Sequence, residues 1–235
     1  EFNNCEAGYI DINGLCFHNG DISVLQKMID NSYATGYTEE NCYEGDPYCG
    51  SPNPYMDSED GWFWVVVDSV YIDHPVTQVT WFGAQAFAKY YQMRLPTINE
   101  WEKAARGIDG GTYPWGDGSP DGTRSNYHDS GDVFDNETTP VGYYDGLNGT
   151  SDSPSPYGAY DMAGNVWEWT QDCWNNSYNG APHNGQAWLT GRCDQRMLRG
   201  GSWDYFNSYA RSASRRGSSV YNRGHNYGFR LAQDL

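Results

Sequence analysis

The sequence predicts an α+β fold in which two main helices and several short strands are joined by irregular, loop-rich segments. Glycine accounts for 28 of the 235 residues and strong helix formers are few, which favours turns and short strands. Aromatic residues make up 16% of the chain, with 10 Trp and 20 Tyr, so large rings with polar tips should build the core. Nothing marks a linker. We expect one main domain over residues 61–235, with residues 1–60 as a Cys-rich N-terminal extension packed on it.

Two amphipathic segments with capping signals predict the main helices. Thr80 can cap a helix over residues 81–91. Thr97 and Glu100 form a capping box for a second helix, which Gly107 ends. In both segments the apolar side chains recur at helical spacing, so each helix should bury one face.

Short apolar runs predict the strands, and a shorter helix is expected near the N-terminus. Residues 62–72 read WFWVVVDSVYI and are β-branched and aromatic, as strands prefer. We expect further strands at 166–171, 197–203 and 228–232, and a helix at 22–29. The segment between, 108–160, has no periodicity, so something other than regular structure must order it.

The charge of the chain excludes a generic nucleic-acid binder. Fourteen Lys and Arg stand against 31 Asp and Glu, a net charge of −17, whereas such binders are basic. No run of apolar residues is long enough for a membrane span. The chain starts at Glu1 without Met, so we expect that a leader or upstream region has been removed.

Positive charge gathers at the C-terminal end. Residues 192–235 hold eight Arg, no Lys and three Asp, a surplus of five positive charges. This surplus allows two interpretations: an anionic ligand, or arginines that pair with carboxylates of the same fold. The second is favoured, because these arginines alternate with small residues and Arg suits buried bidentate pairing.

The six cysteines predict disulfides and a location outside the cytoplasm, in the extracellular space or at the cell surface. Six cysteines can pair in 15 ways, and the spacing favours sequence neighbours. Free thiols or a zinc site are the alternatives, although no CxxC or HxxxH cluster occurs. The expected pairs are Cys5–Cys16, Cys42–Cys49 and Cys173–Cys193; glycosylation sequons at Asn136, Asn148 and Asn175 fit that location.

Four motifs, in this order and spacing, identify a family resemblance. They are residues 94–107 (RLPTINEWEKAARG), 113–117 (YPWGD), 160–169 (YDMAGNVWEW), and 199–203 (RGGSW) with 228–230 (GFR). From about residue 75 to 232 the chain resembles the formylglycine-generating enzyme (sulfatase-modifying factor) family. The resemblance implies a variant of the C-type lectin-like fold with short antiparallel strands. Residues 1–60 depart from the family pattern.

The third motif predicts a calcium site. Asp161 and Glu168 flank a glycine-containing turn whose carbonyls can point inward, and hard oxygens suit Ca²⁺. The resemblance implies side-chain ligands from these two carboxylates and backbone carbonyls from Gly164 and Val166. Alternatively, Glu168 pairs with a buried Arg. A second family site would draw on Asn126, the carbonyl of Tyr127 and an acidic residue near Asp132.

The family's catalytic cysteines are missing from this chain. The resemblance implies a cysteine pair, which also holds copper, just after the Gly-Gly-Ser-aromatic motif. No cysteine follows Cys193, and Asp204, Tyr205 and Ala210 cannot supply a thiolate. No other catalytic constellation stands out, so we expect that the protein is not an enzyme.

The segment 204–227 predicts a ligand-binding face instead. Mixtures of Tyr, Ser, Gly and Asn make good contact surfaces, because rigid rings and small polar residues combine there. The segment also resembles the variable proteins of diversity-generating retroelements. The residues expected to be exposed and to contact a ligand are Asp204, Tyr205, Phe206, Ser208, Tyr209, Tyr221, His225 and Tyr227.

Three function classes remain open. The favoured one is a non-catalytic, calcium-stabilised domain, extracellular or at the cell surface, whose partner is a protein or glycan ligand or another copy of the chain. The others are a structural subunit of a surface assembly or filament, and an enzyme of unrecognised chemistry on the same fold.

Overall fold

The computed structural model describes residues 9–12, 15–18, 73–134 and 136–234. The predicted helix at 22–29, the predicted strand at 62–72 and most of the N-terminal extension lie outside the described residues. So do Cys5, Cys42 and Cys49, and with them both N-terminal disulfide predictions. Of the extension, the structure describes a backbone hairpin of β1 (Tyr9–Ile12) and β2 (Leu15–His18), paired antiparallel.

Both main helices form where their caps predict them. Helix α2 spans Trp81–Tyr90, and the Thr80 hydroxyl accepts a hydrogen bond from the Gly83 amide at 3.0 Å. Helix α3 spans Ile98–Arg106 and begins with the expected capping box, in which Thr97 and Glu100 each accept the other's backbone N–H. Local chemistry therefore sets the start of each helix.

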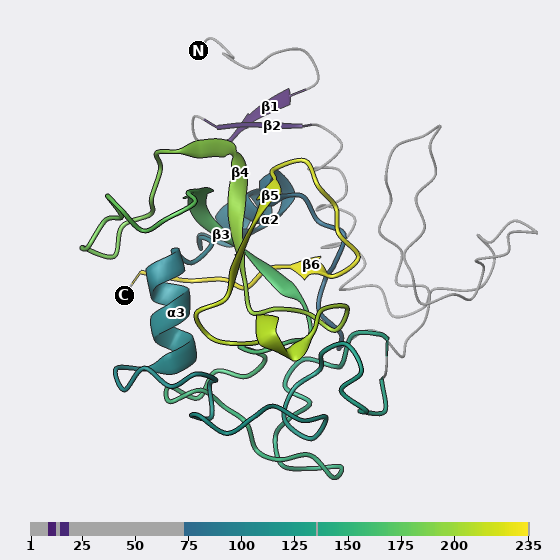
Figure 1. Ribbon diagram of the computed structural model, residues 1–235. Helices are drawn as coiled ribbons and strands as arrows, with labels where there is room; N and C mark the ends of the chain where they lie inside the picture. The colour runs from purple at the N-terminus through teal and green to yellow at the C-terminus, as the bar shows by residue number, and fades with distance from the viewer. Residues whose placement is uncertain (1–8, 13–14, 19–72, 135, 235) are drawn as a thin grey trace, which may run out of the picture.

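A four-stranded sheet forms the centre of the molecule (Figure 1). Its order is β5-β4-β3-β6, with β3 at Trp167–Trp174, β4 at Arg192–Arg199, β5 at Arg215–Ser219 and β6 at Tyr227–Gly228. The β3–β4 and β4–β5 pairs are antiparallel, as expected, whereas the short β6 pairs parallel to β3. Strand β4 begins and ends earlier than predicted, and β5 was not predicted, since its polar sequence RRGSS lacks apolar alternation.

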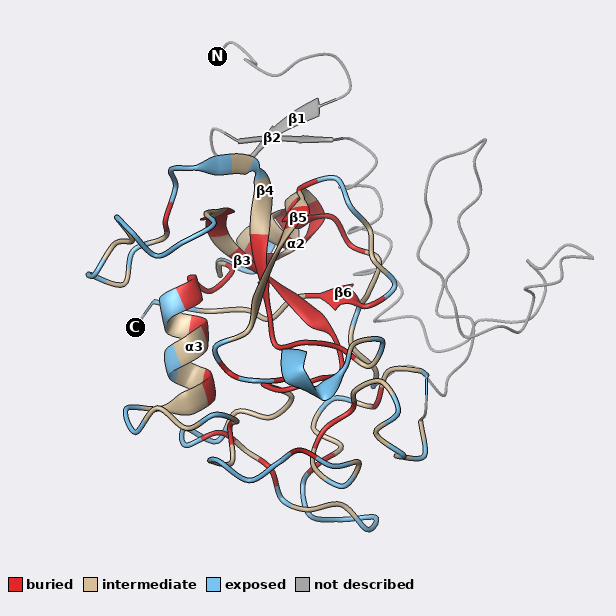
Figure 2. Cartoon of the chain, in the orientation of Figure 1, coloured by how far each residue is buried: buried red, intermediate tan, exposed pale blue. Residues whose placement is uncertain are grey.

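Indole rings build the core between α2 and the sheet, as the composition predicts. Figure 2 shows buried residues along the central strand β3. Two of the core indoles have backbone acceptors: Trp81 donates to the Thr170 carbonyl at 2.8 Å and Trp169 to the Val79 carbonyl at 3.0 Å. Both bonds join the α2 region to β3. Burying Trp and Tyr is favourable only when their polar ends are paired, and these bonds supply that pairing.

The irregular segment after α3 is hydrogen-bonded to the turn before β3. The Asn165 amide donates to the Asn126 carbonyl at 2.8 Å, and the Asn165 side chain bonds both the N–H and the C=O of Thr139. Gly164 has φ 82°, and a Cβ there would lie 2.1 Å from the Asn126 oxygen, so only glycine permits this approach. Side-chain and backbone bonds to one turn therefore order much of this loop.

The predicted disulfide between Cys173 and Cys193 is confirmed. It joins β3 to β4 and closes the loop between them, at a sequence separation of 20. The same loop packs on the N-terminus of α3, where Asp172 accepts the N–H groups of Ile98 and Trp188 at 2.8 and 2.7 Å. In the part of the chain that is described, no helix is long and apolar enough to cross a membrane.

Removing this disulfide should destabilise the domain. Closing a loop of this length restricts the unfolded chain, so the double variant Cys173→Ala/Cys193→Ala should lose about 3 kcal/mol of unfolding free energy. Urea denaturation followed by tryptophan fluorescence measures the loss. Reductant added to the double variant reports the contribution of the other cysteines, and an unchanged midpoint in that variant without reductant would contradict the assigned role.

Candidate binding face and buried charge network

The segment after the Gly-Gly-Ser motif folds back on itself and ends in a 3₁₀ turn at Asn207–Tyr209. Gly201 makes this possible, because it has φ 78° and a Cβ would lie 2.8 Å from the Tyr209 carbonyl oxygen. We call Asp204, Tyr205, Phe206, Ser208, Tyr209 and His225 the aromatic face.

Two tyrosine rings of the aromatic face pack against a buried indole. The Trp167 side chain is 0% exposed, and its ring lies edge-to-face with Tyr205 and Tyr209 at centroid distances of 5.7 and 6.1 Å. The two tyrosine rings meet each other at 5.2 Å in the same manner. Such contacts fix the rings in place, so the face is rigid at its base.

The outer part of the face is exposed. Phe206 is 64% and Tyr209 42% exposed, and Asp204, Ser208 and His225 are also exposed. The His225 Nε2 lies 3.3 Å from the Asp204 carboxylate, which brings the far end of the predicted segment back to its beginning.

Two of the predicted face residues lie elsewhere. Tyr227 is 7% exposed and packs on Trp169 in the core, so the expectation that it is exposed is wrong. Its place in β6, parallel to β3, turns the ring inward. Tyr221 is 66% exposed, but its ring contacts Phe82 of α2 at 5.6 Å rather than the rings around Trp167.

Sequence reasoning missed two residues of this region. The His128 amide donates to the Tyr205 carbonyl at 3.0 Å and its ring meets Phe206 at 5.2 Å. The Arg216 guanidinium lies over the Tyr205 ring at 4.9 Å. His128 stands in the irregular loop, and no spacing in the sequence signals that contact; Arg216 was visible only as one member of the C-terminal arginine surplus.

Below the face, Glu168 is bound by an arginine, as the alternative interpretation of this residue holds. Arg230 donates to both carboxylate oxygens, at 2.5 and 2.6 Å, and the Trp101 indole donates to one of them at 2.6 Å. A second buried ion pair joins Arg199 of β4 to Glu102 of α3. The two pairs connect α3, the sheet and the C-terminal segment.

Asp161 is the residue of the predicted calcium site with an unmet bonding capacity. Its Oδ2 accepts the Gly142 amide at 2.7 Å, while its buried Oδ1 has no hydrogen-bond partner. Burial raises the pKa of this carboxyl to about 6, opposed by the Gly142 bond and the charge of Arg230. An orphaned carboxylate oxygen suits a hard cation, whereas Glu168 is already neutralised by Arg230. Among the described residues, Asp161 does not belong to any group of three or more His, Cys, Asp or Glu side chains that could hold a metal ion.

The second predicted metal set is occupied by its own loop. Asp132 accepts hydrogen bonds from the Ser130 hydroxyl and the Phe134 amide at 2.6 and 2.7 Å, and the Tyr127 carbonyl accepts the Ser130 amide at 2.9 Å. The Asn126 side chain donates to the Glu137 carbonyl at 2.7 Å. The candidate ligand groups therefore make hydrogen bonds within their own loop.

The three sequons differ in access. Asn136 and Asn148 are exposed at turns with φ 69° and 51°. The Asn175 side-chain nitrogen donates to the Cys173 and Thr190 carbonyls at 3.2 and 2.8 Å. In the folded domain, only the first two present a free acceptor nitrogen.

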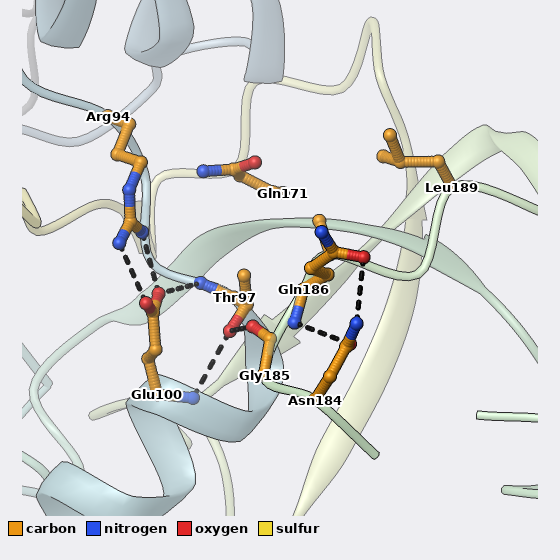
Figure 3. A pocket seen from close by; sticks show the side chains of 9 residues that line it. Arg94, Thr97, Glu100, Gln171, Asn184, Gly185, Gln186 and Leu189 are labelled. Atoms are coloured by element: carbon orange, nitrogen blue, oxygen red, sulfur yellow. Dashed lines mark hydrogen bonds and ion pairs between the residues drawn. The ribbon is translucent and has the colours of Figure 1, made fainter. Parts of the chain in front are cut away.

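A polar groove lies beside α3 and is lined in part by residues of the first family motif, including Arg94 and Glu100 (Figure 3). Arg94 binds Glu100 at 2.6 Å, the Gln171 side chain donates to the Leu95 carbonyl, and Asn184 donates to Gln186. These polar side chains of the groove already have hydrogen-bond or ion-pair partners within the protein, so we interpret the groove as a structural feature rather than as a ligand site.

Comparison with known proteins follows the fold and motifs. A family model described as "Sulfatase-modifying factor enzyme 1-like domain" matches residues 34–235. The chain therefore belongs to the sulfatase-modifying factor family, and its α+β architecture is the C-type lectin-like fold of that family.

Relatives in this family carry different names. "Serine/threonine-protein kinase pkn1" of Chlamydia pneumoniae is 36% identical over 176 residues, covering 73% of this chain and 26% of that protein. "Formylglycine-generating enzyme" of Thermomonospora curvata is 35% identical, covering 69% and 56%. "Inactive C-alpha-formylglycine-generating enzyme 2" of Bos taurus is 34% identical, covering 68% and 50%. The chain thus spans from a quarter to about half of their lengths, and family membership alone does not decide catalysis.

Solved structures agree on the fold. PvdO from Pseudomonas aeruginosa is 31% identical with a TM-score of 0.61, covering 69% of this chain and 63% of that one. Treponema denticola variable protein 1 is 24% identical with a TM-score of 0.53, covering 68% and 70%, a likeness that concerns the fold alone.

The ion pair of Glu168 should be essential to stability. Glu168→Gln removes the carboxylate that binds the partly exposed Arg230 guanidinium, so we expect a loss of about 2–3 kcal/mol in unfolding free energy. Chemical denaturation measures it. Asp194→Asn, at an exposed pair with Arg192 at 3.9 Å, is the control and should change little; equal losses in both variants would contradict the assignment.

The raised pKa of Asp161 predicts a pH dependence in the presence of a chelator. A carboxyl whose pKa is higher in the folded state contributes stability below its unfolded value, and this contribution disappears as the pH rises through about 6. Relative to Asp161→Asn, the protein should lose about 3 kcal/mol between pH 4 and pH 7. Parallel stability curves for the two proteins would refute the burial of an ionised Asp161.

Proposed function

We propose that this chain is a non-catalytic ligand-binding domain of the sulfatase-modifying factor family, which contacts a partner through the aromatic face. The observation that carries the proposal is the replacement of thiols by packed side chains after the Gly-Gly-Ser motif. Tyr205 stands on Trp167, and Ala210 is buried. A phenol and a methyl group offer neither a nucleophilic thiolate nor a copper ligand.

The exposed rings support binding. Phe206 and Tyr209 lie on the same turn and are 64% and 42% exposed, so this face presents two aromatic rings that a partner can cover. The base of the face is held by Trp167 and the His128 amide, so ordering costs on binding are small.

Calcium is part of the proposal. Ca²⁺ bound at Asp161 would pair with the buried carboxylate oxygen that has no hydrogen-bond partner. It would thereby stabilise the turn before β3, to which the irregular segment is hydrogen-bonded. The Cys173–Cys193 disulfide supports a location in an oxidising compartment, at the cell surface or beyond it.

Chelation should therefore lower the melting temperature. Ca²⁺ added to chelated protein should raise it again, because the ion binds only the folded state. Asp161→Asn should remove the response to Ca²⁺ while leaving the fold intact, since Asn accepts the positive φ of 57° at this position. A melting temperature that ignores chelator in the unmodified protein would exclude the site.

Binding should depend on the two outer rings. Phe206→Ala and Tyr209→Ala should each leave the melting temperature nearly unchanged, yet weaken binding to any ligand found on protein and glycan arrays about tenfold or more. Tyr227→Ala is the matched contrast, because loss of this buried ring should cost about 3–5 kcal/mol of stability.

The catalytic alternative has a direct test. Incubated with copper, oxygen and a Cys-X-Pro-X-Arg peptide, the protein should leave the cysteine unoxidised, as judged by mass spectrometry. Formation of the aldehyde would overturn the non-catalytic assignment.

A further inference from the structure

Several C-terminal arginines have no carboxylate within ion-pairing distance in the described part of the chain, and two of them, Arg211 and Arg216, lie beside the aromatic face. Arg199 and Arg230 form the buried pairs described above, and Arg192 lies 3.9 Å from Asp194. Within the described part of the chain, neither Arg211 nor Arg216 has a carboxylate within ion-pairing distance. In a chain with 31 acidic residues and 14 basic ones, such unneutralised guanidinium groups are conspicuous.

Both arginines are nevertheless held in position. The Arg211 Nε donates to the Ser208 carbonyl at 2.8 Å, at the end of the 3₁₀ turn. Arg216 is near the start of β5, and its guanidinium lies over the Tyr205 ring at 4.9 Å. These contacts orient the groups without neutralising them, and they leave N–H donors for a further acceptor.

Two neighbouring tryptophan rings contact the aromatic face. The Nε1 atoms of Trp167 and Trp203 are buried and have no acceptor. Their rings contact Tyr209 and His225 of the aromatic face. Asp204 is the acidic residue of this face, and His225 lies beside it at 3.3 Å.

We propose that the aromatic face takes an acidic polypeptide segment, whose carboxylates pair with Arg211 and Arg216 while an apolar side chain covers Phe206. Carboxylates match the planar fork of Arg in bidentate geometry. A polypeptide can present carboxylates and an apolar side chain together, which matches two arginines beside an exposed Phe206 ring. This inference rests on the proposed function and names the partner's chemistry.

The test uses a fluorescein-labelled peptide rich in Glu with one Leu, read by fluorescence anisotropy with the full chain. We expect saturable binding that weakens with salt, and a Gln-for-Glu peptide bound at least tenfold more weakly. Arg211→Gln/Arg216→Gln should lower the affinity for the Glu peptide tenfold or more. Arg211→Lys/Arg216→Lys should recover part of that affinity. Arg192→Gln removes the same charge on β4 and should bind as the unmodified protein does.

Several outcomes would overturn the proposal: no binding of the Glu peptide, equal binding of the Gln peptide, equal losses in Arg192→Gln, or a sulfated oligosaccharide bound in its place. If Arg216→Gln lowers the melting temperature, the exposed Arg211→Gln alone decides. Array ligands that depend on Phe206 but not on Arg211 would refute the acidic partner and leave the binding function standing. Ligands that depend on neither residue would refute both.

Discussion

The buried carboxylate of Glu168 is the constraint on which the rest of the domain depends. Arg230 from the C-terminal segment and Trp101 from α3 both bind it, one from each side of Glu168 in the sequence. Since a lone ionised carboxylate in this interior is strongly unfavourable, the three segments can be buried only together. The strand that carries Glu168 also carries Trp167 and Trp169, so the same assembly positions the core and the base of the aromatic face.

Local chemistry made the two helices and the described disulfide predictable. The caps at Thr80 and Thr97 act within a few residues, and the Cys173–Cys193 loop contains turn residues that bring neighbouring strands together. The parallel pairing of β6 was not predictable from spacing, because it depends on where the chain returns after β5. Strand β5 was missed for another reason: its Arg215 lies over the ring of Trp174, a residue of β3 that is far away in sequence.

The candidate face was found in part, through an anomaly in composition. The missing cysteines and the wealth of tyrosine after the Gly-Gly-Ser motif located the segment that includes Phe206 and Tyr209. Composition alone does not distinguish an exposed ring from a core ring, which is why Tyr227 was misassigned. Likewise, the pairing of Glu168 with Arg230 required knowing that residues 62 positions apart meet.

The 3₁₀ turn has a consequence for protein engineering. Asn207 and Ser208 are exposed, and the chain around them is held by backbone groups: the Tyr205 carbonyl by His128 and the close approach at Gly201. Side-chain identity between these anchors contributes little to folding, because substitutions at exposed positions away from special contacts are nearly neutral. The turn is therefore a natural place to randomise residues in a display library, with new specificities sampled on an unchanged scaffold.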